Sequence, residues 1–219
     1  MIFSPYPGRV LILARTGDGT LAGIYALTGR SESSRRRQII QLSPAELRVA
    51  PLDDHDHDSL RHYTAALSDE QWTVFGNGEQ VGTVFDRLFA GAPPAVALDD
   101  LSYEPDPPLH TPRITAVVSR SSGTVWLGAA RRPDGLRSTA DVTVTTVREM
   151  AVSDALTLTT YDSDGSSVAV AATVDEFTTP AATPDDLLDE VWSSLDPAYR
   201  VAAALLSPMS GAGATLRHA

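Results

Sequence analysis

The chain has 219 residues and a net charge of −11, from 28 acidic and 17 basic residues. An acidic excess of this size argues against general nucleic-acid binding, which depends on neutralising phosphates with basic side chains. No apolar run approaches the ~18 residues that a membrane helix needs, and the amino terminus lacks the basic start and apolar stretch of a signal peptide. We therefore expect a cytoplasmic protein that contacts neither nucleic acid nor membrane.

Two features of the composition limit the available chemistry. The chain has no cysteine, which excludes disulfides, thiolate metal sites and cysteine nucleophiles. All 17 basic residues are arginine, which indicates a bacterial host with a GC-rich genome and excludes a lysine Schiff base or a lysine general base. The length and the 42% hydrophobic content predict one domain over 1–206, followed by a flexible tail over 207–219.

The first part of the chain has the period-two pattern of strands. Strands are expected at 9–15, 20–27, 38–42, 46–52, 62–67 and 71–75. The polar segment 28–37 is expected to be a basic loop, and 53–58 a solvated turn.

After residue 76 the spacing of apolar residues changes to three and four. Val81, Val84 and Leu88 share one helical face, which predicts a helix over 81–89, and Pro93 is expected in the first turn of a second helix over 93–101. Further strands are expected at 113–118, 124–129, 142–147, 155–160 and 168–174, and two final helices at 184–192 and 197–206.

This order of elements predicts an α+β fold in which sheet packs on sheet with helices outside. A doubly wound α/β fold is disfavoured, because the strands do not alternate singly with helices. The sequence also contains no glycine-rich dinucleotide fingerprint and no Walker loop.

The arginine-rich segment 30–37 is the first candidate for a binding site. Four arginines, Arg30, Arg35, Arg36 and Arg37, are interleaved with Ser31, Ser33 and Ser34 in an otherwise acidic chain. Guanidinium groups bind phosphate with two parallel hydrogen bonds, and serine hydroxyls complete such sites. A solvated surface run explains the same composition, so the segment alone leaves both readings open.

Tyr103 and Glu104 are candidates for proton transfer, one donating a proton while the other accepts one. Arg113 begins a buried-looking strand and indicates a partner anion, although a structural ion pair fits equally well. Thr160 and Tyr161 end a strand and present hydroxyls either to a pocket or to the packing at the sheet edge.

His55 and His57 alternate with aspartates, a spacing that zinc can use. The stretch has no apolar framing to shape a dry cavity, so an exposed acidic loop is the favoured interpretation and we expect no metal.

In combination these stretches resemble the archaeal-type IMP cyclohydrolase family over roughly residues 6–175. The matching stretches, in order, are 8–9, 28–35, Tyr63, 77–78, 103–106 and 111–114. The resemblance implies a four-layer αββα fold, like that of amino-terminal-nucleophile hydrolases but without the terminal nucleophile. It also implies closure of 5-formamidoimidazole-4-carboxamide ribotide to IMP with loss of water, with no cofactor.

The resemblance implies catalytic roles for Tyr63, Tyr103, Glu104 and Arg113. The substrate-binding residues that it implies are Arg9, Arg30, Ser31, Ser33, Arg35, Arg36, Asn77, Gly78 and Thr111. Among these, the arginines of 30–36 are expected to hold the 5′-phosphate and Asn77 to hydrogen-bond the carboxamide. The expected partner is a small purine nucleotide, and a homo-oligomer is left open.

Two alternative functions remain at this point. The first alternative is an enzyme that acts on a related imidazole or purine nucleotide in specialised metabolism. This would fit a GC-rich bacterial host that already has an unrelated cyclohydrolase for purine synthesis. A nucleotide-binding module without turnover would need the phosphate loop, but it has less need for Tyr103, Glu104 and Arg113.

Overall fold

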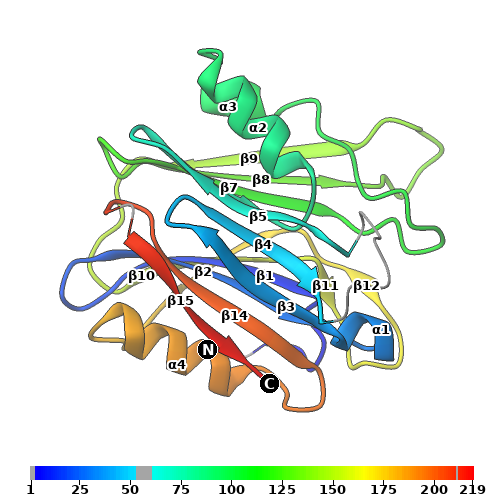
Figure 1. The fold of residues 1–219 in the computed structure, drawn as a ribbon. Coiled ribbons are helices and arrows are strands. Elements are labelled where there is room, and N and C mark those ends of the chain that lie inside the picture. The colour runs from blue at the N-terminus through cyan, green and yellow to red at the C-terminus, as the bar shows by residue number, and fades with distance from the viewer. Residues whose placement is uncertain (1–2, 53–60, 211) are drawn as a thin grey trace.

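The computed structural model describes residues 3–52, 61–210 and 212–219. Nearly all of its strands belong to two antiparallel sheets (Figure 1). The six-stranded sheet has the order β13 (Val174–Thr178), β10 (Asp154–Thr159), β1 (Arg9–Arg15), β2 (Leu21–Thr28), β14 (Arg200–Ser207), β15 (Ala212–His218). The seven-stranded sheet runs in chain order, with β3 (Arg37–Ser43), β4 (Glu46–Pro51), β5 (Tyr63–Ser68), β6 (Trp72–Gly76), β7 (Arg113–Ser119), β8 (Val125–Arg131) and β9 (Asp141–Val147).

The two sheets pack against each other through the largest hydrophobic cluster. This cluster takes Leu11 and Leu13 from β1, and Ile114 and Ala116 from β7. Because side chains alternate along a strand, every second residue of each strand enters this layer and the others face outward.

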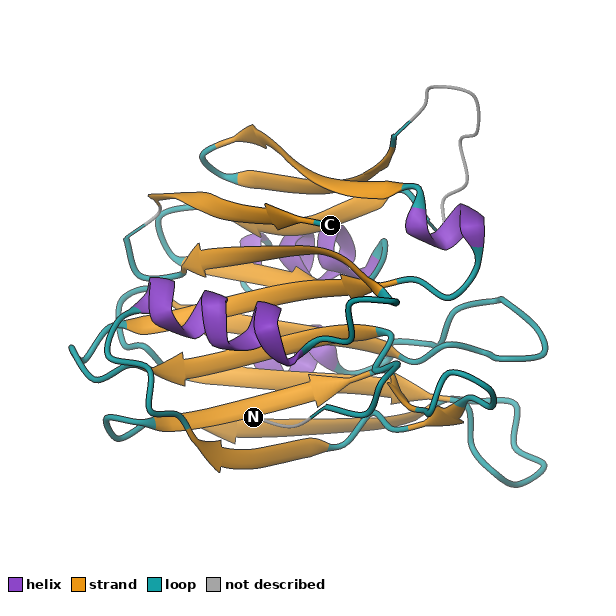
Figure 2. Cartoon of the chain, turned by 90° about the horizontal axis from the view of Figure 1, so that it is seen from below, coloured by secondary structure: helices purple, strands orange, loops and turns teal. Residues whose placement is uncertain are grey.

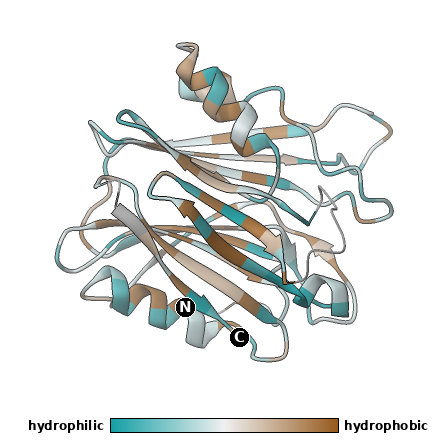
Figure 3. Cartoon of the chain, viewed as in Figure 1, coloured by the Kyte–Doolittle hydropathy of each residue, from teal (hydrophilic) through white to brown (hydrophobic). Residues whose placement is uncertain are grey.

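Helices cover the outer faces of the two sheets (Figure 2). Helix α4 (Pro184–Ser194) packs Leu187, Leu188 and Val191 on the six-stranded sheet and is banded teal and brown in Figure 3, as an amphipathic helix should be. Helices α2 (Gln80–Phe89) and α3 (Pro94–Leu98) cover the seven-stranded sheet. The smaller elements are α1 (Glu32–Arg35), β11 (Tyr161–Asp162) and β12 (Ala169–Val170).

The α+β class is confirmed, and most strands and three of the four predicted helices form within a few residues of the expected bounds. The helix expected over 197–206 is wrong, because these residues form β14. Its alanine- and leucine-rich run favours a helix locally. The same run is buried on both faces between β2 and β15, where a central strand needs small apolar residues on either side.

Two further expectations are corrected. The flexible tail expected over 207–219 contains β15, which pairs with β14 from Ala202↔His218 to Ser207↔Ala212. The strand expected over 168–174 is replaced by the short β12 and by β13, which begins only at Val174. No helix in the described residues is long and apolar enough to cross a membrane.

Candidate active site

Polar side chains occupy one end of the layer between the sheets. In three strands, and at the residue that follows β6, a polar side chain stands two positions from an apolar residue of the core between the sheets. The pairs are Arg9 and Leu11, Arg37 and Ile39, Tyr63 and Ala65, and Asn77 and Phe75. The same alternation that builds the core therefore gathers these polar groups at its end.

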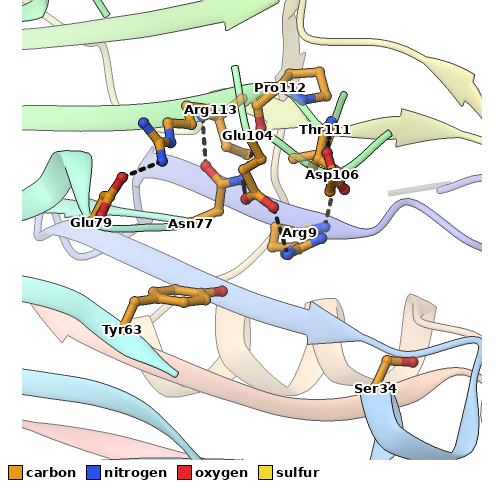
Figure 4. Close-up of polar contacts among 12 residues, drawn as sticks. Arg9, Ser34, Tyr63, Asn77, Glu79, Glu104, Asp106, Thr111, Pro112 and Arg113 are labelled. Carbon is orange, nitrogen blue, oxygen red and sulfur yellow. Dashed lines mark hydrogen bonds and ion pairs between the residues drawn. The ribbon is translucent and has the colours of Figure 1, made fainter. Parts of the chain in front are cut away.

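Glu104 enters this polar end from the loop between α3 and β7. The loop is fixed by its own bonds: Glu104 N donates to Thr111 O at 2.8 Å, and Asp106 accepts from Thr111 N and Thr111 Oγ1 at 2.7 and 2.5 Å. The Glu104 side chain is 3% exposed. Its Oε1 accepts from Asn77 Nδ2 at 3.0 Å, and its Oε2 lies 3.5 Å from Arg9 Nη2 (Figure 4).

This environment gives Glu104 a pKa close to neutrality. Burial raises the pKa of Glu104 from 4.5 to about 7, because desolvation penalises the carboxylate and outweighs the attraction of Arg9; Asp106 raises it further. Burial lowers the pKa of Arg9, but Glu104 together with the surrounding tyrosines more than offsets this and raises it above its ordinary value. The result is a fixed cation beside a carboxyl group that can accept or release a proton near pH 7.

Arg9 itself is held by the backbone of neighbouring segments. Gly8 adopts φ +75°, and a Cβ there would lie 2.2 Å from Thr160 Oγ1, so only glycine fits. This close approach lets Arg9 N donate to Thr160 Oγ1 at 3.0 Å. Thr160 thus contributes to the candidate site by positioning Arg9.

Asn77 has every hydrogen-bonding position of its side chain filled. Its Nδ2 donates to Glu104 Oε1 and to Pro112 O at 3.0 and 2.8 Å. Its Oδ1 accepts from Gln80 Nε2 and Ile114 N at 3.1 and 2.7 Å. An amide has two donor hydrogens and two acceptor lone pairs. Asn77 therefore orients Glu104 and has no bond to spare for a ligand.

Three tyrosines lie around Arg9. Tyr25 and Tyr63 share a hydrogen bond of 2.6 Å between their hydroxyls, and burial raises the pKa of Tyr25 above its ordinary value. Burial also raises the pKa of Tyr161 to about 12, while its hydroxyl bonds Thr111 Oγ1. Figure 4 places Tyr63 across from Arg9 and Glu104.

The comparisons with known proteins bear on this arrangement. The family model described as IMP cyclohydrolase-like protein matches residues 6–209. The chain belongs to this family. It is 31% identical over 128 residues to the IMP cyclohydrolase of Methanopyrus kandleri, which covers 56% of this chain and 62% of that protein. It is 31% identical over 130 residues to the IMP cyclohydrolase of Methanothrix thermoacetophila, covering 57% and 63%.

A third IMP cyclohydrolase, from Natronomonas pharaonis, is 31% identical over 134 residues, which covers 58% of this chain and 64% of that protein. The chain thus aligns with less than two thirds of the length of these three relatives.

Within this member of the IMP cyclohydrolase-like family, Arg113 and Gly78 lie beside the buried centre. Arg113 Nη2 donates to the exposed Glu79 Oε1 at 2.7 Å, and the Arg113 charge acts to lower the pKa of Glu104. A Cβ at Gly78 would lie 3.7 Å from Arg113 Nε. Arg113 is therefore a second cation within electrostatic reach of Glu104.

The arginine segment lies apart from Glu104, on the exposed side of the site. Ser31 caps the short helix α1 through Ser34 N and bonds the Ser33 hydroxyl at 3.1 Å. Arg30, Arg35 and Arg36 are exposed, and Arg30 lies 5.8 Å from the centre of the Tyr6 ring. The Tyr6 ring in turn stacks on Tyr161, with 5.8 Å between centroids, which connects this segment to the tyrosines around Arg9.

Tyr103 and Glu104, though adjacent in sequence, point to different surroundings. The half-buried Tyr103 ring packs edge-on against His110, with 5.3 Å between ring centroids. Of the two tyrosines that the resemblance implies to be catalytic, Tyr63 acts electrostatically on Arg9.

The sequence interpretation missed Tyr25, and it placed Arg37 in an exposed basic loop rather than at the buried start of a strand. Both are buried and face the layer between the sheets. The signal for Arg37 was present, because it stands two positions before the core residue Ile39, but the surrounding arginines suggested a wholly exposed loop.

His55 and His57 lie outside the described residues. Elsewhere in the described chain, no three His, Asp or Glu side chains gather in an arrangement that could hold a metal ion.

Proposed function

We propose that this chain closes 5-formamidoimidazole-4-carboxamide ribotide to IMP with loss of water, the final step of purine synthesis. Membership of the IMP cyclohydrolase-like family and three relatives named IMP cyclohydrolase support this proposal. The observation that carries it is Glu104, a buried carboxyl group with a pKa of about 7, held between Arg9 and Asn77.

The reaction requires two protons to move to one oxygen. The carboxamide nitrogen attacks the formyl carbon and loses one proton, and the formamide nitrogen loses another as the carbon–nitrogen double bond forms. The carbon–oxygen bond of the former formyl group breaks, and both protons leave with that oxygen as water. A single group near its pKa at neutral pH is suited to accept a proton and return it, because both of its forms are populated.

Glu104 is the proposed proton carrier. Asn77 positions its Oε1, so Oε2 faces Arg9 and the reacting atoms. A carboxamide nitrogen is a weak nucleophile, so holding it against the formyl carbon supplies part of the rate, on the order of several kcal/mol for well-oriented groups.

Arg9 and Tyr63 are the proposed stabilisers of the negative charge that develops on the formyl oxygen. Arg9 is buried and cationic, and Tyr63 is a hydroxyl donor whose orientation Tyr25 fixes at 2.6 Å. Fixed donors in a buried site are effective because they need no reorganisation during the reaction. Arg113 adds positive charge at the same end.

The exposed arginines of the α1 segment are the proposed phosphate-binding groups. Arg30 and Arg35 form no ion pair within the described residues, although the chain carries an acidic excess. Their guanidinium groups are therefore available for two parallel hydrogen bonds to a phosphate.

We also propose that α4, the two sheets and the α2–α3 pair form the four-layer αββα sandwich implied by the family resemblance. Three separate hydrophobic clusters, one between each pair of neighbouring layers, support this arrangement.

The test is turnover of the formylated ribotide by the purified chain, followed by the absorbance change on ring closure. The parent should turn over, and Glu104→Gln should lower kcat by about 10²–10⁴-fold because it removes the proton carrier without a change of shape. Glu70→Gln, an exposed change on the β5–β6 turn, is the matched control and should leave kcat unchanged. Nucleotide binding without turnover by the parent would instead indicate a binding module.

A further inference from the structure

Arg37 is a buried arginine held by neutral groups. It begins β3 and is 4% exposed. Its Nε donates to Ser34 O at 2.8 Å, and its Nη2 donates to Thr28 O at 3.3 Å. These two carbonyls fix the plane of the guanidinium group but do not neutralise its charge. No carboxylate in the described part of the chain forms an ion pair with Arg37.

A second buried cation lies close to Arg37. Thr28, whose carbonyl binds Arg37, also donates its backbone N–H to Gly8 O at 2.8 Å, one residue before Arg9. Burial and the repulsion of Arg9 both lower the pKa of Arg37. Glu104 is the carboxylate paired with Arg9, and it is only partly ionised near pH 7. The two positive charges of Arg9 and Arg37 are therefore balanced by less than one full carboxylate charge.

Burying a charge without a partner lowers the stability of the fold, so its presence indicates a role other than stability. A purely structural link between α1 and β3 would need hydrogen-bond donors but no net charge. Two adjacent arginines with one titratable carboxylate instead favour binding of an anion between or beside them.

The guanidinium group of Arg37 retains a free donor edge. Its Nη1 donates to no described residue. It is also not one of the fully buried side-chain atoms without a hydrogen-bond partner, so it is accessible to a ligand. Arg37 also lines a hollow of about 500 Å³ together with Arg35 from α1. Arg200 also lines this hollow, but its guanidinium group stacks on Trp192 at 4.7 Å and its Nη1 donates to Trp192 O at 3.3 Å, so the anion site is assigned to Arg35 and Arg37.

We propose that Arg37 is a buried phosphate-binding residue at the hollow that it lines with Arg35, and that it makes the chain select phosphorylated nucleotides over nucleosides. It presents its open edge to a phosphate monoester, with Arg35 at the mouth of the hollow. The identity of the ligand as a nucleotide rests on the proposed function, whereas the anion site itself does not.

The test is calorimetric titration of the parent and variants with inorganic phosphate, IMP and inosine at fixed ionic strength. The parent should bind phosphate, and should bind IMP more tightly than inosine. Arg37→Met should weaken phosphate and IMP binding about ten- to a hundredfold, the effect of losing charge-assisted hydrogen bonds, while inosine binding stays unchanged. Arg48→Met, at an exposed arginine of β4, is the control and should change none of the three affinities.

Arg37→Lys keeps the experiment decisive if the methionine variant does not fold. Lysine retains the charge but not the planar two-pronged edge, so phosphate affinity should still fall about tenfold in a chain with a parent-like circular dichroism spectrum. Parent-like affinity of a folded Arg37 variant for phosphate and IMP would overturn the proposal, as would a parent that does not bind phosphate. A parent that binds phosphate through Arg37 but neither nucleotide nor nucleoside would support the anion site and contradict the proposed function.

Discussion

Glu104 should make the stability of the chain depend on pH in a way that Glu104→Gln removes. The pKa of Glu104 is about 7 in the folded chain and near 4.5 when unfolded. Between these values the folded chain holds a proton that the unfolded chain has released. Its free energy of unfolding therefore falls as pH rises from about 4.5 to 7, and the loss is complete above pH 7.

The magnitude follows from the size of this pKa difference. At 1.36 kcal/mol per pH unit, moving from 4.5 to about 7 corresponds to about 3 kcal/mol of lost stability. Glutamine mimics the protonated carboxyl group at every pH and can still accept from Asn77 Nδ2. Glu104→Gln should therefore match the parent near pH 4.5 and be more stable by about 3 kcal/mol at pH 8.

The assay is urea unfolding at several pH values between 4.5 and 8.5 at constant ionic strength, with the free energy extrapolated to water. The quantity of interest is the difference between variant and parent, since it removes the contribution of every other titrating group. Glu70→Gln, which removes an exposed carboxylate, should give a small difference throughout. A Glu104→Gln difference that stays constant with pH would refute the account of the buried carboxyl group.

Three further outcomes are expected. Tyr63→Phe should lower kcat by about 10²–10⁴-fold with KM nearly unchanged, whereas Tyr103→Phe should have a much smaller effect because its ring packs away from Arg9; steady-state kinetics of both variants distinguishes them. Arg30→Ala and Arg35→Ala should raise KM about ten- to a hundredfold, as expected for lost charge-assisted contacts to phosphate. Unchanged KM values would show that the α1 segment is a solvated surface without a role in binding. Turnover should persist in EDTA; loss on chelation with recovery on adding zinc would contradict this and implicate the histidines of 53–58.

Local patterns in the sequence were enough for much of the fold. Short apolar runs bounded by turn residues located β1, β2 and most of the seven-stranded sheet, and the spacing of Val81, Val84 and Leu88 located α2. These signals are local, because the apolar residues that a strand or helix buries recur at fixed spacings within one short segment. The chemistry of a tyrosine–glutamate pair indicated Glu104, and the family resemblance implied Arg9 and Asn77.

The tertiary structure decided whatever depends on distant neighbours. The helix-favouring run 200–207 became a strand because β2 and β15, from opposite ends of the chain, flank it and bury both of its faces. The sequence named Tyr63 and Tyr103 alike, and strand position decided that the Tyr63 hydroxyl enters the layer between the sheets near Arg9 while the Tyr103 ring packs on His110. Arg36 caps the end of α1 and is exposed, whereas Arg37 begins β3 and is buried, so the change from helix end to strand separates a buried cation from an exposed one.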